Sequence, residues 1–101
     1  MHYHKLVRDR IIERIEAKGE RAIWHTATDE EYHERLLAKL DEEVREFTEA
    51  CSPEEMSDIF EVITALLAEQ GWALEDIVAL QKQKRKERGG FDRKIILEET
   101  W

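Results

Sequence analysis

Two long stretches of this chain have apolar residues at helical spacing, and the short segment Cys51-Ser52-Pro53 separates them. Ser52 is a favourable N-cap, the proline after it suits the first position of a helix, and Glu55 completes a capping box. Thr28 followed by Glu31 fits a capping box at the start of the first stretch. The pattern therefore predicts a helix over residues 29–50 and a second helix over residues 53–70. Two helices joined by so short a break fold back on each other. This constrains the fold more than any other feature of the sequence.

Two further helices are predicted, over residues 6–18 and 74–87, and each is followed by glycine. Residues 21–26 and 94–97 are β-prone and can pair as two short strands. Hydrophobic residues make up 42% of the chain and charged residues 40%, with one proline, which is typical of a mostly helical protein. We therefore expect a single domain, residues 1–101, with an all-α fold: a four-helix bundle that carries at most this short β pairing.

The chain has a formal net charge of −8 and a single cysteine. A free-standing binder of DNA or RNA is normally basic, so a nucleic acid polymer is not an expected partner. The lone Cys51 excludes an internal disulfide and a cysteine metal cluster. No apolar stretch approaches a membrane span and no signal peptide is evident, so we expect a cytoplasmic protein without a membrane partner. Because a short helical chain has a modest core, we expect a homo-oligomer, either a dimer or a tetramer.

Acidic residues recur at every third position in two triplets, which are Glu43, Glu46 and Glu49, and Glu55, Asp58 and Glu61. With 24 acidic residues among 101, random placement gives roughly five or six pairs at this spacing, about as many as the sequence contains. Position on the helix is more informative than spacing. Glu43 and Glu46 flank the apolar stripe of the first central helix. Glu55 and Asp58 flank that of the second, and the third acid of each triplet points towards solvent.

A carboxylate at a helix–helix seam is costly unless it has a partner. One interpretation is that a basic neighbour supplies the partner, such as Lys39, one turn before Glu43. The other is that facing carboxylates hold a cation, because oxygen-only sites suit Mg²⁺ or Mn²⁺. The helical positions leave both interpretations open, and taken alone they favour the first.

Four segments, taken in order, resemble a known family: HKLVRDRI, AKLDEEVREFTEA, EEMSDIFEVITAL and KQKRKERGGFDRKIIL. The chain resembles the all-α nucleoside triphosphate pyrophosphohydrolases of the MazG-like superfamily, and in particular a small branch described as phosphoribosyl-ATP pyrophosphohydrolase-like. Eight residues separate Glu46 from Glu55, a short gap for the superfamily that fits this branch. The resemblance spans nearly the whole chain, and the ordered set of segments is far more specific than the acid motif.

The resemblance implies hydrolysis of a nucleoside triphosphate to the monophosphate and pyrophosphate, with Mg²⁺ or Mn²⁺ as cofactor, and a role in nucleotide-pool house-cleaning. It also implies a helical bundle that assembles into dimers or larger oligomers. By motif match the metal ligands are Glu43, Glu46, Glu55 and Asp58, with Glu43 and Glu46 also catalytic. The same match places Lys39 at a phosphate. The alternative is a non-catalytic interaction or regulatory module, or a nucleotide sensor, on the same fold.

Five further basic residues are expected to bind substrate, and each has a second interpretation. Lys5 and Arg8 open the first predicted helix, where they can reach phosphates, as the resemblance implies, or lie in solvent. Lys84, Arg88 and Lys94 flank the pair Gly89-Gly90. Backbone amides at a glycine pair can face a phosphate. The alternative is an ordinary helix end, where basic residues are favourable.

Overall fold

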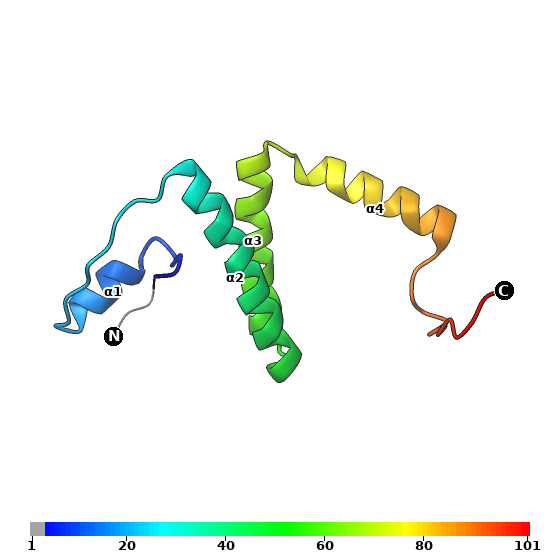
Figure 1. Ribbon diagram of the computed structural model, residues 1–101, viewed down its shortest axis with the longest axis horizontal. Helices are drawn as coiled ribbons and strands as arrows, with labels where there is room; N and C mark the ends of the chain where they lie inside the picture. The colour runs from blue at the N-terminus through cyan, green and yellow to red at the C-terminus, as the bar shows by residue number, and fades with distance from the viewer. Residues whose placement is uncertain (1–3) are drawn as a thin grey trace. The chain divides into compact units, whose positions relative to one another are not determined.

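In the computed structural model, residues 4–101 are described and form four α-helices and no β-strand. The helices are α1 (Ile11–Ala17), α2 (Asp29–Ala50), α3 (Pro53–Gln70) and α4 (Leu74–Arg88) (Figure 1). The all-α prediction is therefore confirmed. No helix in the described range has both the length and the apolar character needed to cross a membrane. The chain divides into two compact units, one that ends at Gln70 and one that begins at Gly71.

Both central helices begin at the predicted capping residues. The Oγ1 atom of Thr28 accepts a 3.2 Å hydrogen bond from the backbone N–H of Glu31. The Oγ atom of Ser52 likewise accepts a 3.2 Å hydrogen bond from the N–H of Glu55. Each bond satisfies one of the N–H groups that the start of a helix leaves without an internal partner. The bounds of α2 and α3 agree with the predicted ranges.

The turn between α2 and α3 depends on the backbone of Cys51. This residue is left-handed, with φ 48° and ψ 45°, and its N–H donates to the carbonyl oxygen of Phe47 at 2.7 Å. A left-handed residue after the last turn closes a helix and redirects the chain. Only two residues separate α2 from α3, which begins at Pro53, and the two helices lie side by side (Figure 1). We call this pair the α2–α3 hairpin.

The α2–α3 hairpin has a small apolar core. Leu36 of α2 is 2% exposed and Val62 of α3 is 6% exposed, and no other apolar residue among residues 4–101 is as fully buried. A polar contact joins the same two helices, since Nδ1 of His33 lies 2.8 Å from Oε1 of Glu69. The hairpin is therefore the scaffold on which the acidic residues of the first unit are placed.

The first helix is shorter than predicted. It covers Ile11–Ala17 instead of residues 6–18, and its N-cap, Arg10, makes no side-chain capping bond. Residues 4–10, here named the N-terminal segment, are not helical. Lys5 and Arg8 thus precede the helix that they were expected to open. The physical reason is that both side chains form ion pairs with acids of the α2–α3 hairpin, contacts that local helix propensity does not include.

The predicted β pairing is wrong for the part of the chain that the structure describes. Neither residues 21–26 nor residues 94–97 form a strand. A strand needs a ladder of hydrogen bonds with a partner, and Ile23 and Ile96 are instead 105% and 82% exposed. Lys94 has φ 57°, which is outside the extended region, so the second segment is not extended at its first residue.

In the unit that begins at Gly71, α4 ends one residue later than predicted. Gly89 follows the helix with φ 84°, and its N–H donates to the carbonyl oxygen of Arg85 at 2.8 Å. Glycine adopts this positive φ without steric cost. Basic residues fill the last turn, where they face the negative end of the helix dipole. The structure shows a helix end at the glycine pair, and a phosphate contact there stays a prediction.

Replacing Ser52 by alanine removes the cap of α3, so we expect the free energy of unfolding to fall by about 1 kcal/mol. Ser57→Ala is the matched control, because Ser57 is an exposed serine within the same helix whose Oγ donates to the carbonyl oxygen of Glu54 at 2.7 Å. Alanine favours a helix interior, so the control should change stability by less than about 0.5 kcal/mol. Urea titration followed by circular dichroism measures both, and equal losses would contradict the capping role.

Candidate metal centre

Glu43 is the most deeply buried charged residue that the structure describes. It lies on α2 against α3, and the residue is only 6% exposed. Its Oε2 atom is buried and has no hydrogen-bond partner, and the same is true of Oε2 of Glu55 on α3. A buried ionised carboxylate is costly unless a positive charge or hydrogen-bond donors compensate it. The two free oxygens therefore mark a place that favours a cation.

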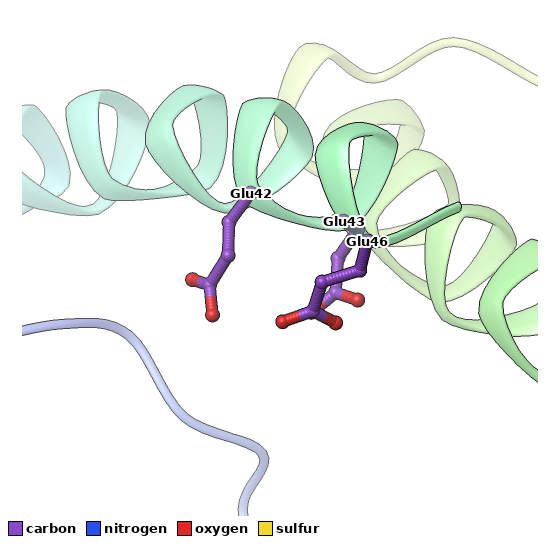
Figure 2. Close-up of side chains that lie close together, drawn as sticks. All are labelled: Glu42, Glu43 and Glu46. Carbon is purple, nitrogen blue, oxygen red and sulfur yellow. The ribbon is translucent and has the colours of Figure 1, made fainter. Parts of the chain in front are cut away.

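Two groups of carboxylates meet at Glu43, and in each group the oxygens that could serve as ligands lie within 4.8 Å of one another. The first group joins both helices of the hairpin and contains Glu43, Glu55 and Asp58. The second lies on α2 and contains Glu42, Glu43 and Glu46, whose side chains project from the same side of the helix (Figure 2). An oxygen-only donor set of this kind suits a hard divalent cation such as Mg²⁺ or Mn²⁺.

Lys39 compensates only part of this charge. Its Nζ atom lies 3.4 Å from Oε1 of Glu43 and 3.5 Å from Oε2 of Glu42, so it is shared between two acids of the next turn. The other oxygen of Glu43, Oε2, stays without a partner. Lys39 therefore satisfies one oxygen of the buried carboxylate, as the first interpretation expects, but not the other.

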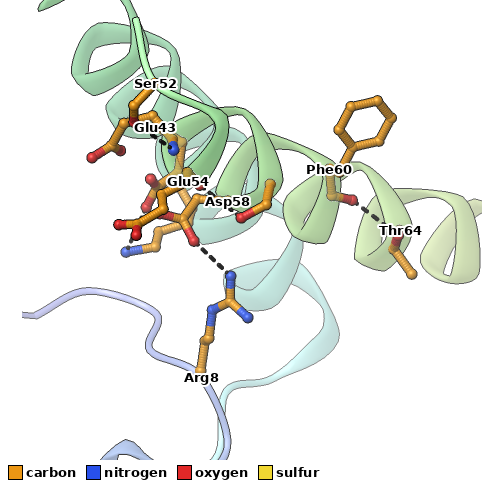
Figure 3. Close-up of polar contacts among 10 residues, drawn as sticks. Arg8, Glu43, Ser52, Glu54, Asp58, Phe60 and Thr64 are labelled. Atoms are coloured by element: carbon orange, nitrogen blue, oxygen red, sulfur yellow. Dashed lines mark hydrogen bonds and ion pairs between the residues drawn. The ribbon is translucent and has the colours of Figure 1, made fainter. Parts of the chain in front are cut away.

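The N-terminal segment supplies two more cations to the same group of acids. Nη2 of Arg8 lies 2.8 Å from Oδ1 of Asp58 (Figure 3). Nζ of Lys5 lies 3.3 Å from Oε1 of Glu42. The acids on α2 and α3 thus face three basic side chains, two of them from a segment far away in sequence.

The pKa values of two adjacent acids on α2 move in opposite directions. Burial raises the pKa of Glu43, and the nearby carboxylate of Glu46 raises it further, while the hydrogen bond from Lys39 opposes both. Burial also acts to raise the pKa of Glu42, but Lys39 and Lys5 outweigh it and the net shift is downward. Among these acids, the buried Glu43 therefore gains most from an added cation.

A cleft of about 450 Å³ lies beside the acids, within the volume range of small-ligand sites. The N-terminal segment, α2 and α3 form its walls, and both Glu43 and Asp58 line it. Arg8, Arg10 and Lys39 contribute positive charge to these walls. A ligand in the cleft would therefore contact carboxylates and basic side chains at the same time.

The structure brings together most of the residues that the sequence predicts for the site, namely Lys5, Arg8, Lys39, Glu43, Glu46, Glu55 and Asp58. Glu49 is exposed, as predicted, and Glu61 is exposed but also lines the cleft. Lys84, Arg88 and Lys94 are exposed in the unit that begins at Gly71, and their contact with substrate stays a prediction.

Sequence reasoning missed Glu42, which the structure places in the second carboxylate group and in ion pairs with Lys5 and Lys39. Its signal was a spacing of four residues to Glu46, which also brings side chains together on a helix. Arg10 was missed as well, and only the three-dimensional path of the N-terminal segment shows that it lines the cleft.

Comparison with known proteins does not name a function. No family model matches the chain, and no solved structure matches it at a significant level. An uncharacterized protein of Mycolicibacterium smegmatis is 52% identical over 46 residues, which is 46% of this chain and 47% of that protein. The match thus spans about half the length of this curated relative.

Because burial raises the pKa of Glu43 above 4.5, its ionised form destabilises the metal-free fold relative to its protonated form. That cost is present above the folded-state pKa and is lost as the pH falls through it towards 4.5. In EDTA, Glu43→Gln should therefore be more stable relative to the wild type at pH 7 than at pH 5. Urea titrations across this range measure the difference. Glu49→Gln controls for the loss of one exposed charge on α2, and a gap between Glu43→Gln and wild type that is independent of pH would refute the prediction.

Proposed function

We propose that this chain is a metal-dependent nucleoside triphosphate pyrophosphohydrolase of the MazG-like kind. The observation that carries the proposal is the unpartnered, buried Oε2 atom of Glu43, next to a second unpartnered oxygen on Glu55. The four ordered segments of the sequence support the same reaction through their resemblance to that superfamily. Mg²⁺ or Mn²⁺ is the proposed cofactor, because every potential ligand in the two groups is a carboxylate.

The charge balance around Glu43 agrees with a divalent cation. Five carboxylates belong to the two groups, which are Glu42, Glu43, Glu46, Glu55 and Asp58. Three basic side chains pair with them, which are Lys5, Arg8 and Lys39. With every acid ionised, five negative and three positive charges leave a local charge of −2. The cluster is therefore negative even with these basic side chains in place, which favours an added cation.

The residues have three roles in the proposed reaction: they hold the cation, accept a proton and bind the triphosphate. Glu43, Glu55 and Asp58 would hold the cation between α2 and α3. A cation bound there offsets phosphate charge and lowers the pKa of a bound water. Glu46 is exposed at the edge of the cluster, so its carboxylate can accept the proton of the attacking water.

The basic wall of the cleft would bind the triphosphate. Lys39 and Arg8 both line the cleft, and their side chains can donate hydrogen bonds to phosphate oxygens. In the reaction, the oxygen of water forms a bond to one phosphorus. The phosphoanhydride bond between the monophosphate and the pyrophosphate breaks, and pyrophosphate leaves. Positioning and charge compensation supply most of the catalysis in phosphoryl chemistry of this type.

The direct test is to incubate the protein with a panel of nucleoside triphosphates and Mg²⁺ or Mn²⁺, and to measure pyrophosphate. We expect release from at least one nucleotide, and a fall in kcat of about 100-fold or more in Glu43→Gln and in Asp58→Asn. Glu49→Gln, an exposed acid of α2, should keep wild-type activity. Circular dichroism confirms that each variant is folded. Nucleotide binding without turnover would identify a sensor instead of an enzyme.

We also propose that the chain assembles into a homo-oligomer through the α2–α3 hairpin. Its buried apolar core is small, whereas large apolar side chains of both helices are exposed: Leu37 by 47%, Val44 by 44%, Met56 by 36% and Phe60 by 60%. If these side chains form one apolar patch, that patch is a candidate interaction site. A short chain with a limited core gains stability from such contacts.

Sedimentation velocity tests the assembly. Phe60→Ser should shift the protein towards the monomer, because it replaces the most exposed of these hairpin side chains by a polar one. Ile23→Ser is the matched control, since Ile23 is a fully exposed apolar residue outside the helices. A wild-type protein that sediments as a monomer at high concentration would rule out the oligomer.

A further inference from the structure

The N-terminal segment (residues 4–10) binds one acid from each carboxylate group. Arg8 pairs with Asp58 at 2.8 Å, and Asp58 belongs to the group that joins the two helices of the hairpin. Lys5 pairs with Glu42 at 3.3 Å, and Glu42 belongs to the group on α2. The segment therefore provides counter-charges to both groups at once (Figure 3 shows the Arg8 pair).

The ion pairs of this segment are accessible to solvent. The side chain of Arg8 is 55% exposed and that of Asp58 is 38% exposed. The helix that follows the segment, α1, buries none of its residues. Exposed ion pairs contribute about 0.2–1 kcal/mol each. A competitor that binds the same acids moderately well can therefore displace the segment.

A divalent cation is such a competitor, because it requires the carboxylate that Arg8 occupies. The candidate ligand oxygens of Glu43, Glu55 and Asp58 lie within 4.8 Å of one another. Arg8 pairs with only one of these acids and leaves Oε2 of Glu43 and of Glu55 without a partner. A cation among the three carboxylates would compensate all of them and carries twice the charge of a guanidinium. The acids therefore favour the cation over Arg8.

We propose that Arg8 is a gating residue: it pairs with Asp58 when no metal is bound, and a divalent cation displaces it and loosens the N-terminal segment around Arg8. Arg8 lines the cleft, so its freed guanidinium becomes available there for the phosphate oxygens of a nucleotide. The displacement follows from the ion pair and the ligand geometry, whereas the second step rests on the proposed function. Binding of the metal thus also makes the guanidinium of Arg8 available to bind phosphate.

Calorimetric titration with MnCl₂, without nucleotide, tests the displacement. Arg8→Ala removes the competitor, so we expect it to bind Mn²⁺ about two- to fivefold more tightly than the wild type, the range that one exposed ion pair supports. Arg10→Ala is the matched control: it removes the same charge from the same segment and the same cleft, but Arg10 makes no ion pair with these acids in the described structure. Its affinity for Mn²⁺ should change less than that of Arg8→Ala.

Limited digestion with trypsin tests the loosening of the segment in the wild type. Mn²⁺ should accelerate cleavage after Lys5, Arg8 and Arg10 several-fold. Cleavage after Lys82 and Lys86 of α4, in the unit that begins at Gly71, should keep its rate and serves as the internal control. Where pyrophosphate release is measurable, Arg8→Ala should raise the KM for the nucleotide although it tightens Mn²⁺ binding. A purely structural role of Arg8 does not produce these opposite signs.

The outcomes separate the gate from the enzyme. Equal or weaker Mn²⁺ binding by Arg8→Ala, with cleavage of the segment unaffected by Mn²⁺, overturns the gate alone. No Mn²⁺ binding by any of the proteins overturns the gate and the metal centre together. Tighter binding by Arg8→Ala and metal-dependent cleavage, but no pyrophosphate from any nucleotide, supports the displacement and overturns the proposed function.

Discussion

The burial of one carboxylate determines the character of the α2–α3 hairpin. Glu43 is 6% exposed, Lys39 reaches only one of its oxygens, and the other has no partner. Replacing a buried charge by an apolar group often stabilises a fold, so a half-compensated carboxylate at a helix seam is poor evidence for a purely structural role. The raised pKa of Glu43 expresses the same imbalance. The hairpin therefore contains a buried negative charge that nearby basic side chains compensate only in part.

The turn between α2 and α3 determines where the acids around Glu43 lie. The left-handed Cys51 ends α2 and the Ser52 cap starts α3, so only these two residues connect the helices. The candidate ligand oxygens of Glu55 and Asp58, on the first turns of α3, then lie within 4.8 Å of that of Glu43 in the second half of α2. A residue inserted in the turn would change how α3 packs on α2 and would move its acids relative to Glu43. The turn is therefore part of the site, although it contributes no ligand.

The features predicted well from sequence depend on neighbours along the chain. The caps at Thr28 and Ser52 fix α2 and α3, and helical positions identify the acids at their seam. The features predicted poorly depend on distant contacts. The first helix begins late because Lys5 and Arg8 pair with acids 37 and 50 residues away. The β-prone segments find no hydrogen-bonding partner in the described chain, and no local pattern encodes a partner's absence.

The N-terminal segment and a divalent cation are alternative counter-charges for one set of acids. In a chain of net charge −8, a triphosphate is repelled unless positive charge is concentrated where it binds. The guanidinium of Arg8 serves that purpose less well while it pairs with Asp58. In the proposed gate, a cation bound at Glu43, Glu55 and Asp58 would offset their charge and would free Arg8 beside the cleft. Under the proposed gate, the metal would therefore change the electrostatics of the cleft by more than its own charge, and the metal would bind before the nucleotide.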